Sequence, residues 1–444
     1  MEPRMHAAAP SATAPEVSNA GAPAAAPIRV FGQDLSLAKS FWDGTQRACD
    51  PQDTVRRLRA LAPRIGLTRL ANVTGLDVVG VPVWVAIRPN SRGLATSQGK
   101  GLTHAAAQAS ALMESVECWH AEHIERPVRV DSPWSFGRKA PIVQYQRLSH
   151  YEDSPPRADQ PIAWVEGYDL LQDGPCWLPL ESVSTNYVGS GQRGSATTFM
   201  QSSNGLAGGN EVLEAIVHAL KELIERDAIH YAGEAMRSFD SARRVRIETI
   251  DDADCRAVID KLDAAGVSVA AFDLTSDLGI PVYGCSIVDA DDALRWRTLP
   301  HFNGYGCHLN PGIAMLRAVT EAVQSRLTYI SGSRDDIAPG QYRSGGNPNA
   351  LKSYREAWAR SPASLDFRER RNLATSSFNG DIRYLLDTLR AAGIDNAVAV
   401  DLRKPEIGVS VVRMVVPGLA GALSHGRAIR VPQRDRLARG GAPR

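Results

Sequence analysis

Two long segments of the chain repeat their apolar positions with the period of an α-helix. The first runs from about residue 102 to residue 124 and carries Ser110, Glu114 and Glu117 among its apolar residues. Positions three apart lie on the same face of a helix, so Glu114 and Glu117 can present their carboxylates to one ion. Acidic pairs with this spacing are common on solvated helices, and the pair alone is a weak indication of a site.

The second segment, about residues 211–231, has a clearer division of faces. Its leucine and isoleucine residues follow core spacing, whereas Glu214, Glu222 and Glu225 fall within about 80° of one another around the helix axis. A loop rich in glycine, residues 203–210, precedes it, and glycines before a helix let backbone N–H groups approach an anion closely. We expect Asn210 to cap this helix.

A shorter pattern recurs along the chain. Residues 255–288 predict a helix, a stop at Gly266, a strand, a turn and a second strand, and residues 382–416 repeat this order with a stop at Gly393. Residues 75–83 resemble the strand, turn and strand half of the unit. The recurrence predicts an α/β fold (mixed α+β) of repeated strand–helix units around a shared sheet.

The two ends differ in composition from the rest. Residues 1–30 are dominated by Ala, Pro, Ser and Gly, and we expect them to be disordered because they hold few large apolar groups. Residues 31–425 are expected to form the folded domain. The tail, residues 426–444, has six arginines and one acid, and two interpretations stay open: a solvated tail, or a segment that docks onto a partner or the active site.

Overall composition excludes some classes of function. The chain is 43% hydrophobic and 22% charged, with 50 basic and 49 acidic residues and a net charge of +1. No global field therefore draws it to nucleic acid or to an anionic membrane. It has neither an apolar run long enough to cross a bilayer nor the pattern of a secretory signal, so we expect a cytoplasmic location.

The two acidic helices suggest a charged site if they face each other. At ~5 Å and an effective dielectric constant of ~20, each pair of like charges costs about 3 kcal/mol. Magnesium that bridges carboxylates to the phosphates of a nucleotide would relieve this repulsion. The spacing leaves a second interpretation open, in which two amphipathic helices carry separately solvated acids. A P-loop is rejected, because the run around Lys100 lacks the GxxxxGK[ST] pattern.

Three stretches of the chain resemble the YcaO family. They are residues 97–120, 202–229 and 316–336, and the similarity spans about residues 38–420. They contain SxxxExxE, NxxxE and ExxER elements in the family's order and spacing. The resemblance implies a YcaO-type fold with the nucleotide site between helices, and it implies ATP and Mg²⁺ as cofactors.

The resemblance also assigns residues. It implies that the five glutamates bind Mg²⁺, and that they bind the nucleotide together with a basic residue, two hydroxyl residues, an asparagine and a late arginine. Arg326 resembles that arginine, with Arg334 as the competing candidate. The metal ligands are Glu114, Glu117, Glu214, Glu222 and Glu225, and the other nucleotide-binding residues are Arg47, Thr54, Ser110, Asn210 and Arg326.

In YcaO-like chemistry a nucleophile adds to a backbone amide of a peptide or protein substrate, and the amide oxygen is phosphorylated by ATP. No residue of the enzyme needs to form a covalent bond. The tail lacks the PxPxP ending of many azoline-forming members, and residues 410–418 are similar to the branch that uses sulfide and a TfuA-like partner to make thioamides.

Other functions stay open at this point. They are azoline formation from a substrate side chain, a role as accessory factor in methylthiolation of ribosomal protein S12, and, in a different class, a nucleotide-binding scaffold without turnover. The intact set of glutamates argues against the scaffold. The sequence leaves a homodimer as an open alternative.

Overall fold

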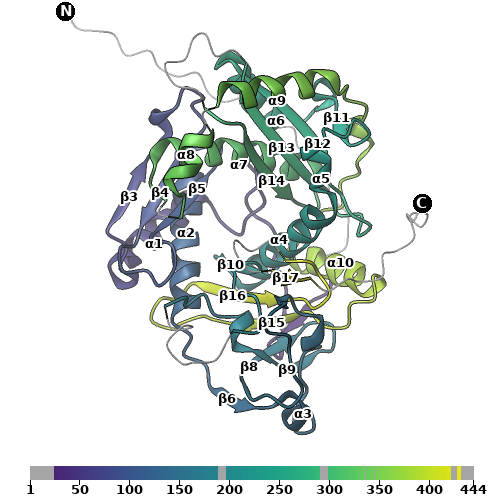
Figure 1. Cartoon of the computed structure of the whole chain (residues 1–444). Coiled ribbons are helices and arrows are strands. Elements are labelled where there is room, and N and C mark those ends of the chain that lie inside the picture. The colour runs from purple at the N-terminus through teal and green to yellow at the C-terminus, as the bar shows by residue number, and fades with distance from the viewer. Residues whose placement is uncertain are drawn as a thin grey trace, which may run out of the picture.

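The computed structural model describes residues 25–188, 197–290, 299–334, 336–345, 347–421 and 428–431. The helices are α1 (Pro51–Leu61), α2 (His104–Glu122), α3 (Pro133–Phe136), α4 (Val212–Ala232), α5 (Glu234–Arg237), α6 (Ala253–Ala264), α7 (Pro311–Ser331), α8 (Pro339–Gly345), α9 (Pro348–Arg360) and α10 (Phe378–Ala391). Figure 1 shows α2, α4 and α7 near the middle of the molecule.

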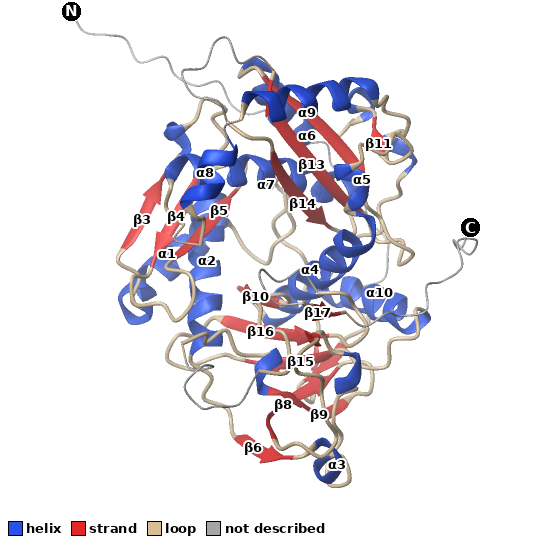
Figure 2. Cartoon of the chain, in the orientation of Figure 1, coloured by secondary structure: helices blue, strands red, loops and turns tan. Residues whose placement is uncertain are grey.

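The strands form several antiparallel sheets (Figure 2). A six-stranded sheet has the order β10 (Leu206–Gly209), β16 (Ser410–Val415), β15 (Val398–Asp401), β8 (Ile162–Asp169), β6 (Val128–Asp131), and β9 (Gly174–Pro179) also pairs with β8. A four-stranded sheet has the order β11 (Arg244–Val245), β12 (Val267–Asp273), β13 (Val282–Asp289), β14 (Phe302–Cys307). Smaller sheets are β3 (Arg69–Asn72), β4 (Val83–Ile87), β5 (Thr96–Lys100); β1 (Ile28–Val30), β2 (Gln33–Leu35); and β17 (Ile429–Arg430), β7 (His150–Tyr151).

The repeated units predicted from the sequence are present, and the mixed fold class is confirmed. Helix α6 leads into β12 and β13, and α10 leads into β15 and β16. The expectation of one shared sheet is wrong, because the two units lie in different sheets. Helix α4 explains the separation, because it lies between these two sheets (Figure 1). Its apolar side chains belong to one core cluster with residues of both sheets.

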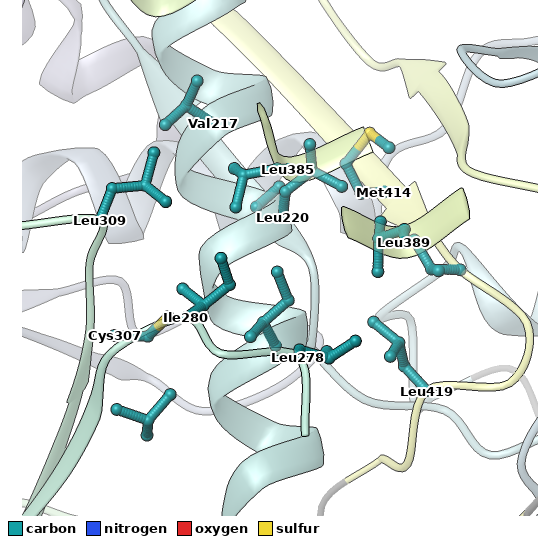
Figure 3. Close-up of a cluster of buried hydrophobic side chains, with 14 of the residues drawn as sticks. Val217, Leu220, Leu278, Ile280, Cys307, Leu309, Leu385, Leu389, Met414 and Leu419 are labelled. Atoms are coloured by element: carbon teal, nitrogen blue, oxygen red, sulfur yellow. The ribbon is translucent and has the colours of Figure 1, made fainter. Parts of the chain in front are cut away.

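The core around α4 is therefore drawn from distant parts of the chain. Val217 and Leu220 of α4 contact a cluster that includes Ile280 and Cys307 from the four-stranded sheet and its loops, and Met414 from β16 (Figure 3). The side chains of Val217 and Leu220 are at most 1% exposed. Because apolar contacts surround most of α4, its polar stripe has one direction left to face.

Helices α2 and α7 begin with well-formed caps. Thr103 Oγ1 accepts a hydrogen bond from Ala106 N before α2, and Asn310 Oδ1 accepts from Gly312 N before α7. Helix α7 packs closely on β14, since a Cβ placed on Gly306 would lie 2.1 Å from the carbonyl oxygen of Ala314. The glycines of β14 thus bring α7 down onto the sheet and fix where its polar side chains lie.

The predicted terminal segments are only partly within the described residues. Residues 1–24 and 432–444 lie outside them, and so do residues 426 and 427 at the start of the predicted tail. Of the predicted N-terminal segment 1–30, Ile28–Val30 forms β1, and of the predicted tail, Ile429–Arg430 forms β17 on β7. Within the described ranges, no helix is long and apolar enough to span a membrane.

Candidate nucleotide and metal site

A cavity of about 1070 Å³ lies between α2, α4 and α7. Segments far apart in the sequence meet at its walls: residues 41–54, β5 with α2, β10 with α4, and α7 with the loop after it. Nine of the ten residues that the resemblance implied line this cavity, namely Arg47, Thr54, Ser110, Glu114, Glu117, Asn210, Glu214, Glu222 and Glu225. The two acidic helices do face a common space.

Arg326 is the residue that the structure does not bring to the cavity. Its side chain is fully buried and pairs with Asp77 at 2.8 Å and with Asp289 at 2.9 Å. The guanidinium is therefore occupied in a structural ion pair. Arg334, the competing candidate, lines the cavity and donates from Nε to Asp336 at 2.8 Å.

The two carboxylates of α2 accept hydrogen bonds from neighbouring strands. Glu114 Oε2 accepts from Gln98 N of β5 at 3.0 Å, and Glu117 Oε1 accepts from Gly208 N of β10 at 2.6 Å. A side chain at Gly208 would prevent the second contact, since a Cβ there would lie 2.6 Å from Met113 Sδ and 3.1 Å from Glu117 Oε1. The glycine loop thus brings β10 into direct contact with α2.

Asn210 connects the start of α4 to α1. Its Oδ1 accepts from Thr54 Oγ1 at 3.0 Å and from Arg57 Nη2 at 2.7 Å. The expected helix cap is wrong: Glu211 occupies the N-cap position, and the amide of Asn210 is held by α1 instead. Glu214 accepts from Asn210 N at 3.1 Å and from Arg47 Nη1 at 3.4 Å, so these residues form one connected group.

Farther along α4, Arg226 lies between two carboxylates. Its Nη2 is 3.9 Å from Glu222 Oε1 and 3.7 Å from Glu225 Oε1. Glu225 is buried, whereas Glu222 keeps about 20% of its side chain exposed toward the cavity. Arg226 thus partly neutralises this pair in the absence of another cation.

Sequence reasoning missed the polar face of α7. Glu321 Oε2 accepts from Lys100 Nζ at 2.9 Å, and its Oε1 accepts from Tyr305 N at 3.2 Å. The spacing could have revealed this face, because the residues three, four, seven, eight and eleven positions after Arg317 are all polar, and these positions share one face of a helix. They are Arg317, Thr320, Glu321, Gln324, Ser325 and Thr328, and all line the cavity.

Negative charge is in excess around the cavity. Among the described residues that line it, eight are acidic and five are basic. Burial raises the pKa of Glu114 to about 7 and that of Glu117 to about 8, despite the backbone N–H that each accepts. Burial likewise raises the pKa of Glu222 to about 7. The site therefore favours either protons or a bound cation.

Burial also acts to raise the pKa of Glu321, but Lys100 and Arg226 outweigh it and hold that pKa below its ordinary value. Glu321 is thus the carboxylate that already has its counterions, whereas the glutamates of α2 do not.

The donor set fits magnesium in its chemistry. Carboxylate oxygens are hard ligands, and the buried excess of negative charge would be offset by a divalent cation. In the part of the chain that the structure describes, no three His, Cys, Asp or Glu side chains converge closely enough to hold a metal ion. Instead the carboxylates bind backbone N–H groups and arginines, as described above, and an ion would have to compete with these partners.

Comparison with known families and relatives matches most of the chain. The model of the family described as YcaO cyclodehydratase, ATP- and Mg²⁺-binding, matches residues 98–420. A protein of Rhizobium leguminosarum bv. trifolii, described as lying in the tfuA 3' region, is 35% identical over 85% of this chain and 89% of its own length. An uncharacterized protein of Methanothermobacter thermautotrophicus is 33% identical over 84% of this chain and 94% of its own.

Solved structures share the fold. A heterocyclase in complex with substrate and cofactor superimposes on 89% of this chain with a TM-score of 0.71 and 21% sequence identity. The match covers 54% of the heterocyclase chain. YcaO from Methanopyrus kandleri, bound with AMPPCP and Mg²⁺, has a TM-score of 0.65 and 24% identity over 86% of this chain and 94% of its own. The chain belongs to the YcaO family, which binds ATP and Mg²⁺ and whose members are ATP-dependent enzymes that modify peptides.

Proposed function

We propose that this chain uses ATP and Mg²⁺ to activate a backbone amide of a peptide or protein, and that sulfide, with the help of a TfuA-like partner protein, then replaces the amide oxygen. The observation that carries the proposal is the gathering of five glutamates from α2 and α4 at one cavity with an excess of negative charge. Support for sulfide comes from the relative in the tfuA 3' region, which matches most of this chain.

The residues divide into two groups in this proposal. Glu114, Glu117, Glu214, Glu222 and Glu225 would hold Mg²⁺, which neutralises charge on a transferring phosphoryl group when it is bound. Arg47, Thr54, Ser110 and Asn210 line the same cavity beside α1 and α2 and would orient the phosphates. Arg334 takes the place that Arg326 was expected to fill, because its side chain lines the cavity.

A second function, azoline formation, is favoured by the similarity to a heterocyclase solved with its substrate. In that reaction the nucleophile is a Cys, Ser or Thr side chain of the substrate itself. The two functions share the activation of the amide and differ in what adds to its carbon. They can therefore be separated by the mass of the product.

The test uses the purified chain with Mg²⁺, ATP and a peptide encoded near its gene, with and without sulfide and a TfuA-like protein. Mass spectrometry should show a product in which one sulfur has replaced one oxygen, and phosphate release should depend on the peptide. Loss of one water without sulfide would assign azoline formation instead. Hydrolysis of ATP that neither peptide nor partner stimulates would contradict both.

A further inference from the structure

Lys100 is a cation of the cavity to which neither the sequence patterns nor the proposed function gives a role. It is the last residue of β5, and its side chain lines the cavity. The run around it lacks the P-loop pattern, in which a lysine commonly binds phosphate. Lysine side chains are rarely withdrawn from solvent unless they are paired, so the surroundings of this lysine should show what it binds.

The direction of the Lys100 side chain is fixed by close packing of β5. A Cβ placed on Gly99 would lie 2.1 Å from the carbonyl oxygen of Ala107, so this side of the strand touches α2. Successive side chains of a strand point to opposite faces, and Lys100 and Gln98 therefore point away from α2. Helix α7 lies on their side, where Thr328 Oγ1 donates to Gln98 Oε1.

Lys100 is held in the cavity by one carboxylate of α7. Its Nζ donates to Glu321 Oε2 at 2.9 Å, and Glu321 Oε1 accepts from Tyr305 N at 3.2 Å, which anchors the carboxylate on β14. The side chains of the pair are 17% and 25% exposed, and both line the cavity. A lysine ammonium has three N–H donors. Glu321 accepts one of them and no other residue in the described ranges accepts from this atom, so two donors remain for a ligand.

The ammonium lies beside carboxylates that are expected to hold magnesium. Gln98, on the same face of β5 and two residues before Lys100, donates its backbone N–H to Glu114 Oε2 at 3.0 Å. Two residues of a strand span only about 6.6 Å. Burial raises the pKa of Glu114 and of Glu225, and Lys100 is among the groups that oppose this rise at both carboxyls.

This part of the cavity is separate from the group around the start of α4. Arg47 and Asn210 contact Glu214 in the first turn of that helix, and Glu225 follows eleven residues later. Eleven residues of helix span roughly 16 Å. We expect the first group to hold the part of the nucleotide that ADP and ATP share, and the cation at the other end, Lys100, is then placed for the phosphate that only ATP carries.

We propose that Lys100, positioned by Glu321, binds the terminal phosphate of a nucleoside triphosphate and so makes the cavity distinguish ATP from ADP. This inference rests on the proposed function only for the binding of ATP and Mg²⁺. An ammonium is a compact charge, and two of its N–H groups can donate to phosphate oxygens while the third stays on Glu321. The end of a strand thus supplies the lysine that a P-loop supplies elsewhere.

The test compares the binding of AMPPCP and of ADP to the chain by calorimetry, each with saturating Mg²⁺ and without peptide. Lys100→Met should weaken binding of AMPPCP at least about tenfold and leave the affinity for ADP within about twofold. Lys100→Arg keeps the charge and should weaken AMPPCP less. Lys139→Met removes an exposed lysine that pairs with Asp131 at 2.8 Å; it is the matched control and should change neither affinity.

The ratio of the two affinities is the informative quantity, because a lysine that only joins β5 to α7 would change both together. An unchanged ratio in Lys100→Met would overturn the inference and leave ATP binding itself intact. If that variant does not fold, Glu321→Gln provides a second test: it should weaken AMPPCP more than ADP, and an equal change of both would overturn the inference. A wild-type chain that binds neither nucleotide would contradict the proposed function as well.

Discussion

Two buried arginines of this protein have opposite surroundings. Arg326 of α7 is fully buried and binds the carboxylates of Asp77 and Asp289, whereas Arg413 of β16 is 3% exposed and binds none among the described residues. The first joins α7 to β13 and to the loop before β4. The second lies in the six-stranded sheet, where its neighbours Leu206, Val400, Val411 and Val415 belong to one apolar cluster.

The difference shows that burial of an arginine in this fold does not by itself imply an ion pair. The attraction within a satisfied buried ion pair offsets much of its desolvation cost, and removing one partner leaves the other charge unpaired. A buried cation without such partners keeps its desolvation cost and lowers the stability of the folded protein. Burial alone therefore says little about function, and the presence or absence of partners is the informative observation.

The largest expected effect is the loss of stability when the paired arginine, Arg326, is substituted. Arg326→Met should lower the free energy of unfolding by about 3–5 kcal/mol, because it leaves Asp77 and Asp289 buried without a cation. Denaturant unfolding measures this. Arg56→Met, which removes an exposed pair with Asp53, is the control and should change the same quantity by less than about 0.5 kcal/mol. Equal losses of unfolding free energy in the two variants would contradict the prediction that the buried ion pairs of Arg326 matter more than an exposed pair.

The next effect concerns the cavity carboxylates. Glu225→Gln should lower the rate of peptide-dependent phosphate release at least about 100-fold, because the charge that neutralises the metal is lost. Its melting temperature should stay within a few degrees of the wild type, since burial already raises the pKa of Glu225 and the substitution removes repulsion. Glu234→Gln, at an exposed position of helix α5, should keep full activity. Large destabilisation by Glu225→Gln would make this acid structural.

Binding of Mg²⁺ and nucleotide should stabilise the folded protein by a somewhat smaller amount. Mg²⁺ with AMPPCP at 100 times its dissociation constant should raise the free energy of unfolding by about 2.7 kcal/mol. Chelation of the metal should remove most of that gain, as should Glu225→Gln. A thermal melt with each component alone and with both together is the measurement. Full stabilisation by AMPPCP in the presence of a chelator would show that the glutamates do not act through a metal.

The smallest effect is a dependence on pH. The pKa values of Glu114, Glu117 and Glu222 are raised to between about 7 and about 8 in the folded chain, from an ordinary value of 4.5. The folded state then holds more protons than the unfolded state, so the stability of the metal-free chain should fall as pH rises from about 4.5 to about 8. Saturating Mg²⁺ should flatten this slope. A metal-free chain that becomes more stable over this range would contradict the raised pKa values.

Much of the site could be predicted from the sequence because it depends on local periodicity. The spacing of Glu114 and Glu117, and of Glu214, Glu222 and Glu225, is a property of single helices, and these residues do line one cavity. What the spacing could not decide was whether the two helices face each other. That depends on contacts such as Glu117 with Gly208, which are 91 residues apart in the chain.

The two wrong predictions, Arg326 at the cavity and Asn210 as a helix cap, also have physical causes. Arg326 lies five positions after Glu321, or about 140° around the helix, and so points away from the cavity face of α7. Its partner Asp77 is 249 residues distant, which no local pattern reveals. The cap expected at Asn210 failed for a similar reason, because Thr54 and Arg57 from another helix hold its amide oxygen.

Helix α4 carries three of the site glutamates and is also packed between the two larger sheets. Its position is consequently set by side chains such as Leu278 and Leu389, which never meet a nucleotide (Figure 3). A change of volume at such a residue would shift the helix and with it the spacing of the metal ligands. Loss of activity from substitutions deep in the interior is therefore to be expected, and distance from the cavity will be a poor guide to which residues evolution or engineering can alter freely.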